Sequence, residues 1–486
     1  MKAKKQTITI KKSNGRVYTP NFIVNNILDL SSYYGEKILL KHAIDNSCGD
    51  GAFLKEVVKR YCEESIKRKV NLDSIKKELE YYIHGIEIDE IERTKCIDNL
   101  ENVSRTYGIY NVKWDIICGD ALKECKFDGK MDFVLGNPPY IRIHNLGDSF
   151  DNVKNFSFAQ SGMTDIYIVF YEIGIKMLNE TGVLGYITPS SFFNSVAGSF
   201  MRRELIRQNL LSKVVNLRHF QAFKATTYTT IIILEKNRRK EEIEYYEYNE
   251  RNLIPYYVDT LSSNDFYISD AYYFAKKSEL RLLKKIFFNL GKSDILVKNG
   301  YATLCDGVFI NTFLFQSKYI IPVIKASTGA TNKIIYPYDE NTKLISQEVL
   351  SNEKELYAYL VAHKKDLQKR TNEKSEDKYW YAFGRSQALN DTYRDKLSIN
   401  TLLRTIKDWK IVFAPKGTGV YSGLYITSKI ISYESIENAL KSEEFISYIA
   451  LLGKYKNGGY YTFSSKDVKS YLDYKFAYNG GLSNDE

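Results

Sequence analysis

The sequence predicts an α/β fold: a doubly wound, mostly parallel sheet followed by a second domain of α+β type. From about residue 43 to residue 235, short apolar runs alternate with segments of helical spacing. This alternation is typical of a parallel sheet covered by helices. The chain of 486 residues also exceeds what one hydrophobic core usually supports. Two domains are therefore expected.

The strands of the predicted sheet are short and apolar. They are expected at 43–45, 83–88, 115–118, 133–135, 183–187, 214–217 and 229–234, with helices at 53–68 and 165–178. The last two runs lie close together in the chain, which favours an antiparallel pair at the edge of the sheet. We expect an antiparallel edge on an otherwise parallel sheet.

An amphipathic helix is expected before the sheet. Its apolar face comprises Phe22, Ile23, Ile27 and Leu30. Thr19 suits the N-cap and Pro20 the first helical position, because proline has the φ of a helix and needs no amide donor there.

The domain boundary is expected after the charged stretch 236–244 and before about residue 262, and we divide the chain into 1–250 and 251–486. The second half is irregular in pattern, rich in Tyr, Phe and Lys, and has glycine-containing turns at 417–419 and 458–459. Its secondary structure cannot be assigned from periodicity.

Composition narrows the class of protein. The net charge of +10 favours a polyanionic partner. No apolar run approaches the roughly 20 residues of a membrane span, and no apolar segment follows the basic N-terminus as in a signal peptide, so a cytoplasmic protein is expected. The six cysteines show no C-x-x-C pair and no histidines at zinc spacing, which indicates reduced thiols and no metal site.

The most informative motif is Asn137-Pro138-Pro139-Tyr140, directly after the apolar run 132–136. In an open α/β sheet, ligands bind where the strands end, and two prolines stop the strand there. The Asn137 side-chain carbonyl and the Pro138 main-chain carbonyl are acceptors, and Tyr140 offers a flat ring. The motif suits a planar substrate with an amino group, although a simple Pro-Pro turn remains the alternative.

Three more strand ends carry polar motifs. Gly49 and Gly51 lie between a strand and a helix, where they allow a tight turn and close approach of a ligand. Glu87 ends the next strand and is placed to accept from ribose hydroxyls, and Asp120 after the third strand is placed to accept from an adenine amino group. Each acid alone is more often a helix cap or a surface residue.

In this order, residues 45–53, Glu87, Asp120 and 137–140 resemble the successive motifs of S-adenosylmethionine-dependent methyltransferases that act on DNA adenine N6. The segment 15–20 resembles the motif that precedes the glycine turn in the gamma arrangement (TaqI-like and Eco57I-like enzymes) and contacts the methionine part of the cofactor. Segments 165–170, 182–189 and 223–234 resemble later motifs. The resemblance implies a Rossmann-like class I methyltransferase domain over most of the first half.

The resemblance also implies site residues and S-adenosylmethionine as cofactor, without a metal. The implied cofactor-binding residues are Tyr18, Thr19, Pro20, Asp45, Cys48, Gly49, Gly51, Phe53, Glu87, Ile88, Asp120, Ala121 and Asn137. The catalytic residues are Asn137, Pro138, Pro139 and Tyr140. Tyr140 and Phe223 are expected to stack on a flipped target base, with Phe220 and Tyr228 as competitors of Phe223.

The second half resembles the C-terminal target recognition domain of the same enzymes through residues 306–310, 367–370, 380–385 and 410–413. Such domains read a short duplex sequence, so basic and aromatic residues are expected to contact phosphates and bases, with core packing as the alternative for each aromatic. The partners implied are double-stranded DNA and either a separate restriction endonuclease or none. A bacterial cytoplasmic monomer without membrane contact is expected.

Other functions stay open at this point. A protein-glutamine methyltransferase also presents a planar amide to such a motif, but enzymes of that kind lack a large domain after the catalytic one. An RNA N6-adenine or DNA N4-cytosine methyltransferase is a further alternative. A catalytically dead DNA-binding protein is disfavoured by the presence of Asp45, Glu87, Asp120 and Asn137 together.

Overall fold

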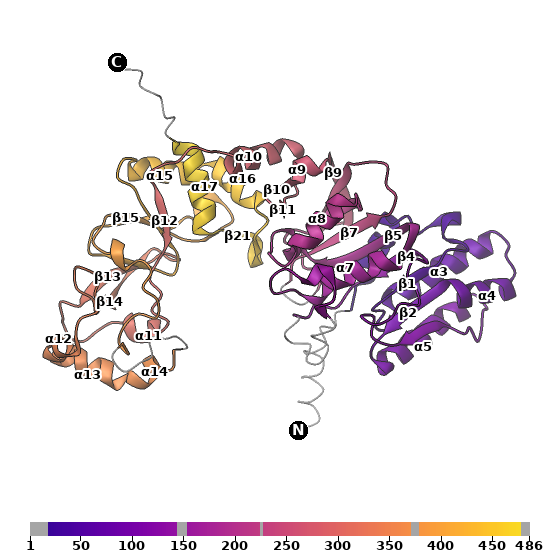
Figure 1. Cartoon of the computed structure of the whole chain (residues 1–486), viewed down its shortest axis with the longest axis horizontal. Helices are drawn as coiled ribbons and strands as arrows, with labels where there is room; N and C mark the ends of the chain where they lie inside the picture. Colours follow the sequence, from indigo (N-terminus) through magenta and orange to yellow (C-terminus); the bar gives the residue numbers. More distant parts are fainter. Residues whose placement is uncertain (1–17, 143–152, 224–226, 371–378, 478–486) are drawn as a thin grey trace, which may run out of the picture. The chain divides into compact units, whose positions relative to one another are not determined.

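The computed structural model describes residues 18–142, 153–223, 227–370 and 379–477. The chain forms two compact units, Met1–Arg281 and Leu282–Glu486 (Figure 1). This division falls later than the 250/251 division expected from the sequence. Residues 250 and 251 lie in the turn between two paired strands of the first unit, β8 (Ile243–Asn249) and β9 (Ile254–Leu261).

The first unit is built on a nine-stranded sheet with the order β3-β2-β1-β4-β5-β7-β6-β8-β9. Its first five strands in the chain run parallel, and β7 is antiparallel to both of its neighbours. The remaining bounds are β1 Ala43–Asp45, β2 Ile83–Glu87, β3 Asp115–Cys118, β4 Met131–Gly136, β5 Leu178–Pro189, β6 Leu211–Asn216 and β7 Thr229–Glu235. All seven predicted strands are present, and the doubly wound α/β fold is confirmed.

The predicted antiparallel pair is β6 and β7, but it does not form the edge of the sheet. Strand β8 pairs in parallel with β6, and β9 pairs antiparallel to β8 at the edge. The sequence around β8 looks charged, yet Ile243 and Tyr245 are fully buried and alternate with half-buried Glu244 and Tyr246. This two-residue period makes β8 a strand with one face in the core.

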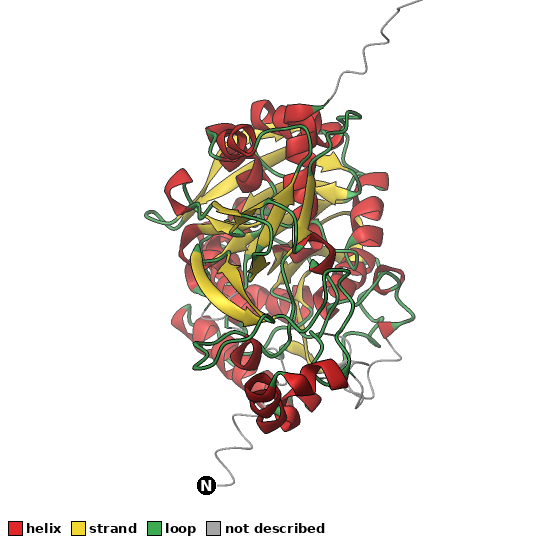
Figure 2. Ribbon diagram, turned by 90° about the vertical axis from the view of Figure 1, so that its left-hand side faces the viewer, coloured by secondary structure: helices red, strands yellow, loops and turns green. Residues whose placement is uncertain are grey.

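Helices flank this sheet, and Figure 2 shows them in red around the yellow strands. Three of them, α3, α4 and α5, pack beside β1 and β2 (Figure 1). Their bounds and those of the other helices of this unit are α2 Asn21–Leu30, α3 Ala52–Lys67, α4 Leu72–Tyr82, α5 Glu90–Thr106, α7 Ile166–Met177, α8 Ser199–Arg207 and α9 Ser263–Phe266. The short strands β10 (Tyr267–Ile268) and β11 (Ala271–Tyr272) follow, and α10 (Lys277–Phe287) crosses the division between the units.

The expected N-terminal helix is α2, and it starts one residue later than predicted. Pro20 is the N-cap, with extended backbone (φ −61°, ψ 144°), and its carbonyl accepts from the amides of Ile23 and Val24. Thr19 is not the N-cap, and its hydroxyl accepts a hydrogen bond from the Asn137 side chain. The apolar face is confirmed: Ile23 and Ile27 are fully buried in the core beside α3 and the sheet.

The second unit consists of short strands in three small sheets, with helices between them. The sheet orders are β12-β19-β15-β17, β14-β13-β18 and β16-β21-β20. The strands are β12 Leu296–Asn299, β13 Ile320–Lys325, β14 Ala330–Ile335, β15 Lys396–Ile399, β16 Leu402–Leu403, β17 Val412–Ala414, β18 Gly419–Tyr421, β19 Leu424–Thr427, β20 Tyr455–Lys456 and β21 Tyr460–Thr462. The helices are α11 Asp306–Phe309, α12 Gln347–Asn352, α13 Lys354–Ala362, α14 Lys364–Gln368, α15 Tyr433–Leu440, α16 Glu443–Leu451 and α17 Ser465–Phe476.

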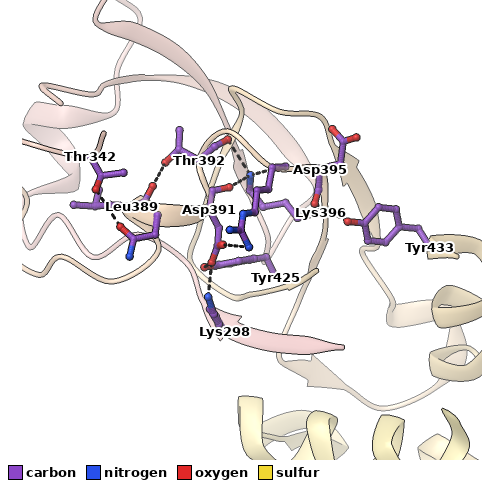
Figure 3. A network of polar contacts seen from close by, with 11 residues as sticks. Lys298, Thr342, Leu389, Asp391, Thr392, Asp395, Lys396, Tyr425 and Tyr433 are labelled. Atoms are coloured by element: carbon purple, nitrogen blue, oxygen red, sulfur yellow. Dashed lines mark hydrogen bonds and ion pairs between the residues drawn. The ribbon is translucent and has the colours of Figure 1, made fainter. Parts of the chain in front are cut away.

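Two buried charged residues of this unit, Asp391 and Lys396, hold the loop around them in place (Figure 3). Asp391 accepts from Lys298 Nζ at 2.6 Å and from the Tyr425 hydroxyl at 2.7 Å. The buried Lys396 donates to the main-chain carbonyls of Asp391, Thr392 and Arg394 at 2.6, 3.2 and 2.7 Å. Burial lowers the pKa of Lys396 to about 8. These contacts satisfy carbonyls that no strand pairs, so the lysine acts as a structural donor.

Within the described ranges, no helix is long and apolar enough to span a bilayer. The same residues contain no group of three or more His, Cys, Asp or Glu side chains arranged to hold a metal ion.

Candidate active site

Four parallel strands of the first unit end at one edge of the sheet. Their last residues are Asp45 of β1, Glu87 of β2, Cys118 of β3 and Gly136 of β4. The predicted motifs follow these ends, so the fold brings together segments that are far apart in the sequence. This edge is where ligands bind in open α/β sheets.

The glycine turn between β1 and α3 needs glycine at two positions for different reasons. Gly51, the N-cap of α3, has φ 83°, and a Cβ there would lie 2.8 Å from the Cys96 sulfur. Gly49 has φ 55°, and a Cβ there would meet nothing within 4 Å. Gly51 is thus required by packing and backbone conformation, whereas Gly49 faces open space beside the main chain, where a ligand can approach.

Glu87 holds the glycine turn in place. Its two carboxylate oxygens accept from the amides of Gly49 at 2.9 Å and Asp89 at 3.0 Å. The adjacent Cys48 amide donates to the Ile86 carbonyl at 3.0 Å, which ties the turn to β2 a second time. Each carboxylate oxygen can accept more than one bond, so Glu87 retains capacity toward a ligand hydroxyl.

Asp45 lies beneath this turn and is 2% exposed. Burial raises the pKa of its carboxyl to about 8, although the carboxyl accepts from the Ser47 amide at 3.0 Å. Gly136 on the neighbouring β4 makes room for it, since a Cβ at Gly136 would lie 2.6 Å from Asp45 Oδ1. Burial of Asp45 therefore favours the protonated form of its carboxyl.

Asp120 and Ile88 lie just beyond the ends of β3 and β2. Asp120 is half-buried and accepts from the Leu122 amide at 3.0 Å, and the Gly119 amide donates to the Glu87 carbonyl at 2.9 Å. Ile88 is 66% exposed, while Ala121 is buried. An exposed apolar side chain near a half-exposed carboxylate suits a flat ring that carries an amino group.

The segment before α2 joins the site to the Asn137 motif. The Asn137 side-chain amide donates to the Thr19 hydroxyl at 3.0 Å, across 118 residues of sequence. The Tyr18 hydroxyl donates to Glu92 on α5 at 3.3 Å, and burial together with Glu92 raises the pKa of Tyr18. Tyr18 and Thr19 thus connect α5 to the end of β4. A segment that contacts a ligand bound next to both α5 and β4 would lie in this way. Residues 15–17 of the matching motif lie outside the described residues.

Tyr140 is held by its hydroxyl and its ring. The hydroxyl donates to the Ile187 carbonyl of β5 at 3.2 Å, and burial holds the pKa of Tyr140 well above its usual value. The ring meets those of Tyr167 and Phe223 edge-on, each at 6.2 Å between centroids and at 76°. A base therefore cannot lie flat against both Tyr140 and Phe223 unless one ring turns.

The two competitors of Phe223 differ in their surroundings. The Phe220 ring stacks on Tyr248 at 4.8 Å within the core, which leaves it poorly placed for a ligand. Tyr228 is half-buried and its ring meets His219 edge-on at 6.3 Å. Phe223 itself is 7% exposed.

Sequence reasoning missed Asn46, Ser47 and Tyr167. The buried Asn46 side chain accepts from the Tyr186 hydroxyl of β5 at 2.9 Å, and the Ser47 hydroxyl donates to the Asn137 carbonyl at 3.5 Å. The signal available was position, because Asn46 and Ser47 lie inside the glycine turn. Tyr167 lies within the segment 165–170, which resembles a later motif, but it was not among the predicted site residues.

Comparisons with known proteins match the part of the chain that carries these residues. The family model of the Eco57I restriction-modification methylase matches residues 26–223. The chain is 24% identical over 420 residues to the type II methyltransferase M.BstVI of Geobacillus stearothermophilus, which covers 76% of this chain and 74% of the relative. It is 24% identical over 386 residues to the restriction enzyme and methyltransferase RM.Eco57I of Escherichia coli, which covers 66% of this chain and 38% of that protein.

Two solved structures share the fold over nearly the whole chain. The type IIL restriction-modification enzyme MmeI, solved in complex with DNA, matches with a TM-score of 0.61 at 15% identity, covering 91% of this chain and 63% of that one. The type ISP enzyme LlaGI, also solved with a DNA substrate mimic, has a TM-score of 0.56 at 14% identity and covers 95% and 46%. The chain thus spans less than two thirds of RM.Eco57I, MmeI and LlaGI. The family model covers the segments that carry the glycine turn, Glu87, Asp120 and the Asn137 motif, so this part of the chain resembles the Eco57I restriction-modification methylases.

Proposed function

We propose that this chain is a site-specific DNA methyltransferase that transfers a methyl group from S-adenosylmethionine to adenine N6 in a short duplex sequence. One observation carries the proposal: the Asn137–Tyr140 motif ends β4 beside the glycine turn, and Thr19 contacts it directly. The proposed acceptors for an amino group, Asn137 Oδ1 and the Pro138 carbonyl, are together called the clamp. The clamp then lies next to the site for a nucleoside.

The residues at the sheet edge fit S-adenosylmethionine. Glu87 would accept from the ribose hydroxyls, and Asp120 would accept from the adenine amino group with Ile88 against the ring. The main chain at Gly49 would lie next to the methionine part of the cofactor. The rest of the site would be formed by Asp45, Cys48, Gly51, Phe53, Ala121 and the segment Tyr18–Pro20. The open space at Gly49 and the exposure of Ile88 support this assignment. When bound, the cofactor supplies an electrophilic methyl group on a sulfonium.

Asn137 and Pro138 would act on the target amine. The N6 lone pair is delocalised into the adenine ring, so the amine is a weak nucleophile. Acceptors on both of its hydrogens draw it toward tetrahedral geometry and stabilise the positive charge that develops. The Asn137 Oδ1 and the Pro138 carbonyl are proposed as these acceptors, and Pro139 fixes the turn that holds them.

Thr19 is proposed to set the orientation of Asn137. Because the Asn137 Nδ2 group donates to the Thr19 hydroxyl, the carbonyl oxygen of the same amide is turned away from Thr19. An amide held in the opposite orientation would place a donor against the target amine. Thr19 thus acts through Asn137, in addition to its place beside the cofactor site.

A duplex adenine must leave the stack to reach this clamp, at a cost of roughly a few kcal/mol. Stacking on an aromatic ring offsets part of that cost, and Tyr140 is proposed for one face. Phe223 is proposed for the other face, with a turn of one ring as the base enters. Once the amine is placed in line with the methyl group, proximity supplies much of the remaining acceleration.

The second unit is proposed to recognise the DNA sequence. Support comes from the fold shared with MmeI, which was solved with DNA, and from the net charge of +10. A restriction endonuclease, where the system has one, is proposed as a separate partner.

The test is a map of modified bases. Genomic DNA from a host without adenine methylation is isolated after expression of the chain and of its Asn137→Ala variant. We expect N6-methyladenine at one short sequence with the natural chain and far less at that sequence with the variant. Modified cytosine, methylated RNA or a methylated protein glutamine in place of N6-methyladenine would refute the proposal.

A further inference from the structure

A small basic hairpin projects from the second unit. It consists of β20 and β21, joined by the turn Asn457–Gly459, and β16 pairs with the outer side of β21. We call residues 402–410 and 454–461 together the basic ribbon. Lys456, Asn457 and Gly458 at its tip are exposed, and Gly458 and Gly459 have positive φ (74° and 79°), as a tight turn requires.

The charge of the basic ribbon is one-sided. Four of its basic side chains are exposed and have no acid within ion-pair distance in the described part of the chain: Arg404, Lys407, Lys410 and Lys456. Its one acid, Asp408, is occupied by the main-chain amides of Arg404 at 3.0 Å and Thr405 at 2.7 Å. With four exposed basic side chains and one acid, the ribbon therefore carries an excess of positive charge.

Other basic residues of this unit behave differently. Lys298 pairs with Asp391 at 2.6 Å, Lys441 and Lys469 pair with acids on their own helices, and the guanidinium of Arg370 is buried against carbonyls. These basic residues of the second unit are thus used within its fold, whereas Arg404, Lys407, Lys410 and Lys456 of the basic ribbon are exposed and pair with no acid of the described residues.

Contacts within the second unit also hold the ribbon in place. The Arg404 guanidinium lies over the Tyr460 ring at 5.2 Å, and a Cβ at Gly459 would come within 3.3 Å of Arg404 Cδ. At its base, the buried Trp409 packs on Phe463 and donates to the Leu440 carbonyl at 2.9 Å. A ribbon already ordered loses little conformational entropy when it binds a partner.

We propose that the basic ribbon enters the major groove of duplex DNA. The major groove of B-form DNA admits a two-stranded β-ribbon, and the phosphates along its edges attract basic residues on either side of the tip. In this arrangement Arg404 and Lys456 contact phosphates and the turn Asn457–Gly459 faces the base edges. The inference rests on the proposed function, because it takes duplex DNA as the substrate.

The test compares two double variants of equal charge change in the full-length chain. Arg404→Glu with Lys456→Glu reverses charge on the ribbon. Lys354→Glu with Lys365→Glu reverses two exposed lysines of α13 and α14 in the same unit. Thermal unfolding and far-ultraviolet circular dichroism verify folding, and the milder pair Arg404→Gln with Lys456→Gln is used if the charge reversal disturbs it. Fluorescence anisotropy then gives the affinity for a duplex that contains the methylated sequence.

We expect the ribbon variant to bind DNA at least about tenfold more weakly and its log-log salt slope to fall by about two, since each phosphate contact contributes roughly 0.9. The control pair should keep the natural slope. If the natural chain binds DNA and the ribbon variant binds equally, the ribbon is not the contact surface and the proposed function stands. If both double variants lose DNA affinity to the same extent, the loss comes from the change in net charge of the protein, and the inference fails. If the natural chain binds no duplex DNA, the proposed function fails as well.

A duplex RNA of the same sequence separates groove entry from charge attraction. The major groove of A-form RNA is too narrow and deep for such a ribbon. We expect RNA to compete poorly, and equal competition by RNA would overturn the groove-entry model.

Discussion

The two units place their polar groups in different ways. In the first unit, the strands join one nine-stranded sheet, and polar side chains gather at the edge where four parallel strands end. In the second unit the strands are two to six residues long, and many loop carbonyls find their donors in buried basic side chains. A basic residue therefore indicates a ligand contact only where it is exposed and has no partner inside the fold.

Arg370 shows this contrast most clearly. It belongs to residues 367–370, which resemble part of a target recognition domain and were expected to contribute DNA contacts. The structure buries Arg370 to 7% exposure, and its guanidinium donates to the carbonyls of Leu367, Thr303, Ala382 and Trp380 at 2.7 to 3.0 Å. It also lies over the Phe309 ring at 5.6 Å. Arg370 is thus part of the core, and for this residue the expectation of a DNA contact is wrong.

The largest expected effect is therefore on stability. Arg370→Met should destabilise the second unit by about 3–5 kcal/mol, because removal of a buried charged donor leaves several carbonyls unsatisfied. Calorimetric unfolding measures this, with Arg385→Met, at an exposed position, as the control. Cofactor affinity of the first unit should change less than about twofold. An unchanged unfolding temperature would show that Arg370 is not structural.

The next effect concerns the site itself. Asn137→Ala should lower the rate of methyl transfer by about 10²–10³-fold, comparable to the loss of one group that stabilises developing charge. Cofactor affinity should stay within a few fold, because the proposed contact is to the target amine. Single-turnover transfer and calorimetric titration of S-adenosylmethionine separate the two. A rate of methyl transfer in Asn137→Ala equal to that of the natural chain would refute the proposed role of Asn137 as an acceptor for the target amine.

The sequence was informative where local pattern and tertiary structure agree. The strands at 43–45 and 115–118 match to the residue, since buried parallel strands are apolar runs bounded by turn residues. Strand β8 was missed because its Glu and Tyr residues hide a buried face, and strand β9 was missed because it is a largely exposed edge strand with no apolar run. The short strands of the second unit have too few residues for any period to emerge.

The sequence predicted which strand ends carry polar motifs, but not the contacts between those motifs. Asp45, Glu87 and Asn137 could be named from their places after strands, and the structure brings these strand ends to one edge. Their mutual contacts could not be predicted, because bonds such as those from Gly49 to Glu87 and from Asn137 to Thr19 depend on how separate segments pack. The buried state of Trp380 and Phe383 in the second unit was likewise invisible, since exposure is a tertiary property.

A smaller effect is expected at Glu87. Glu87→Ala should weaken S-adenosylmethionine binding by about 1.5–3 kcal/mol, the range for hydrogen bonds to a charged group. Because Glu87 also holds the Gly49 amide, part of this loss comes from disorder of the turn. Glu87→Gln retains one acceptor toward Gly49 and should lose less. Calorimetry on both variants gives the two contributions, and unchanged affinity in Glu87→Ala would remove the ribose assignment.

The smallest effect tests the link between Thr19 and Asn137. Thr19→Val keeps the shape of the side chain but removes the acceptor of the 3.0 Å hydrogen bond. A net loss of about 0.5–1.5 kcal/mol is expected for one such bond, which corresponds to a fall of roughly 2- to 13-fold in the rate of methyl transfer. Thr19→Ser restores the hydroxyl and should recover most of the rate, as a positioning role requires. If Thr19→Val instead weakens cofactor binding and leaves the rate at saturating cofactor unchanged, Thr19 serves only the cofactor. In the background of Asn137→Ala, Thr19→Val should have no further effect on transfer, because the amide that it positions is gone.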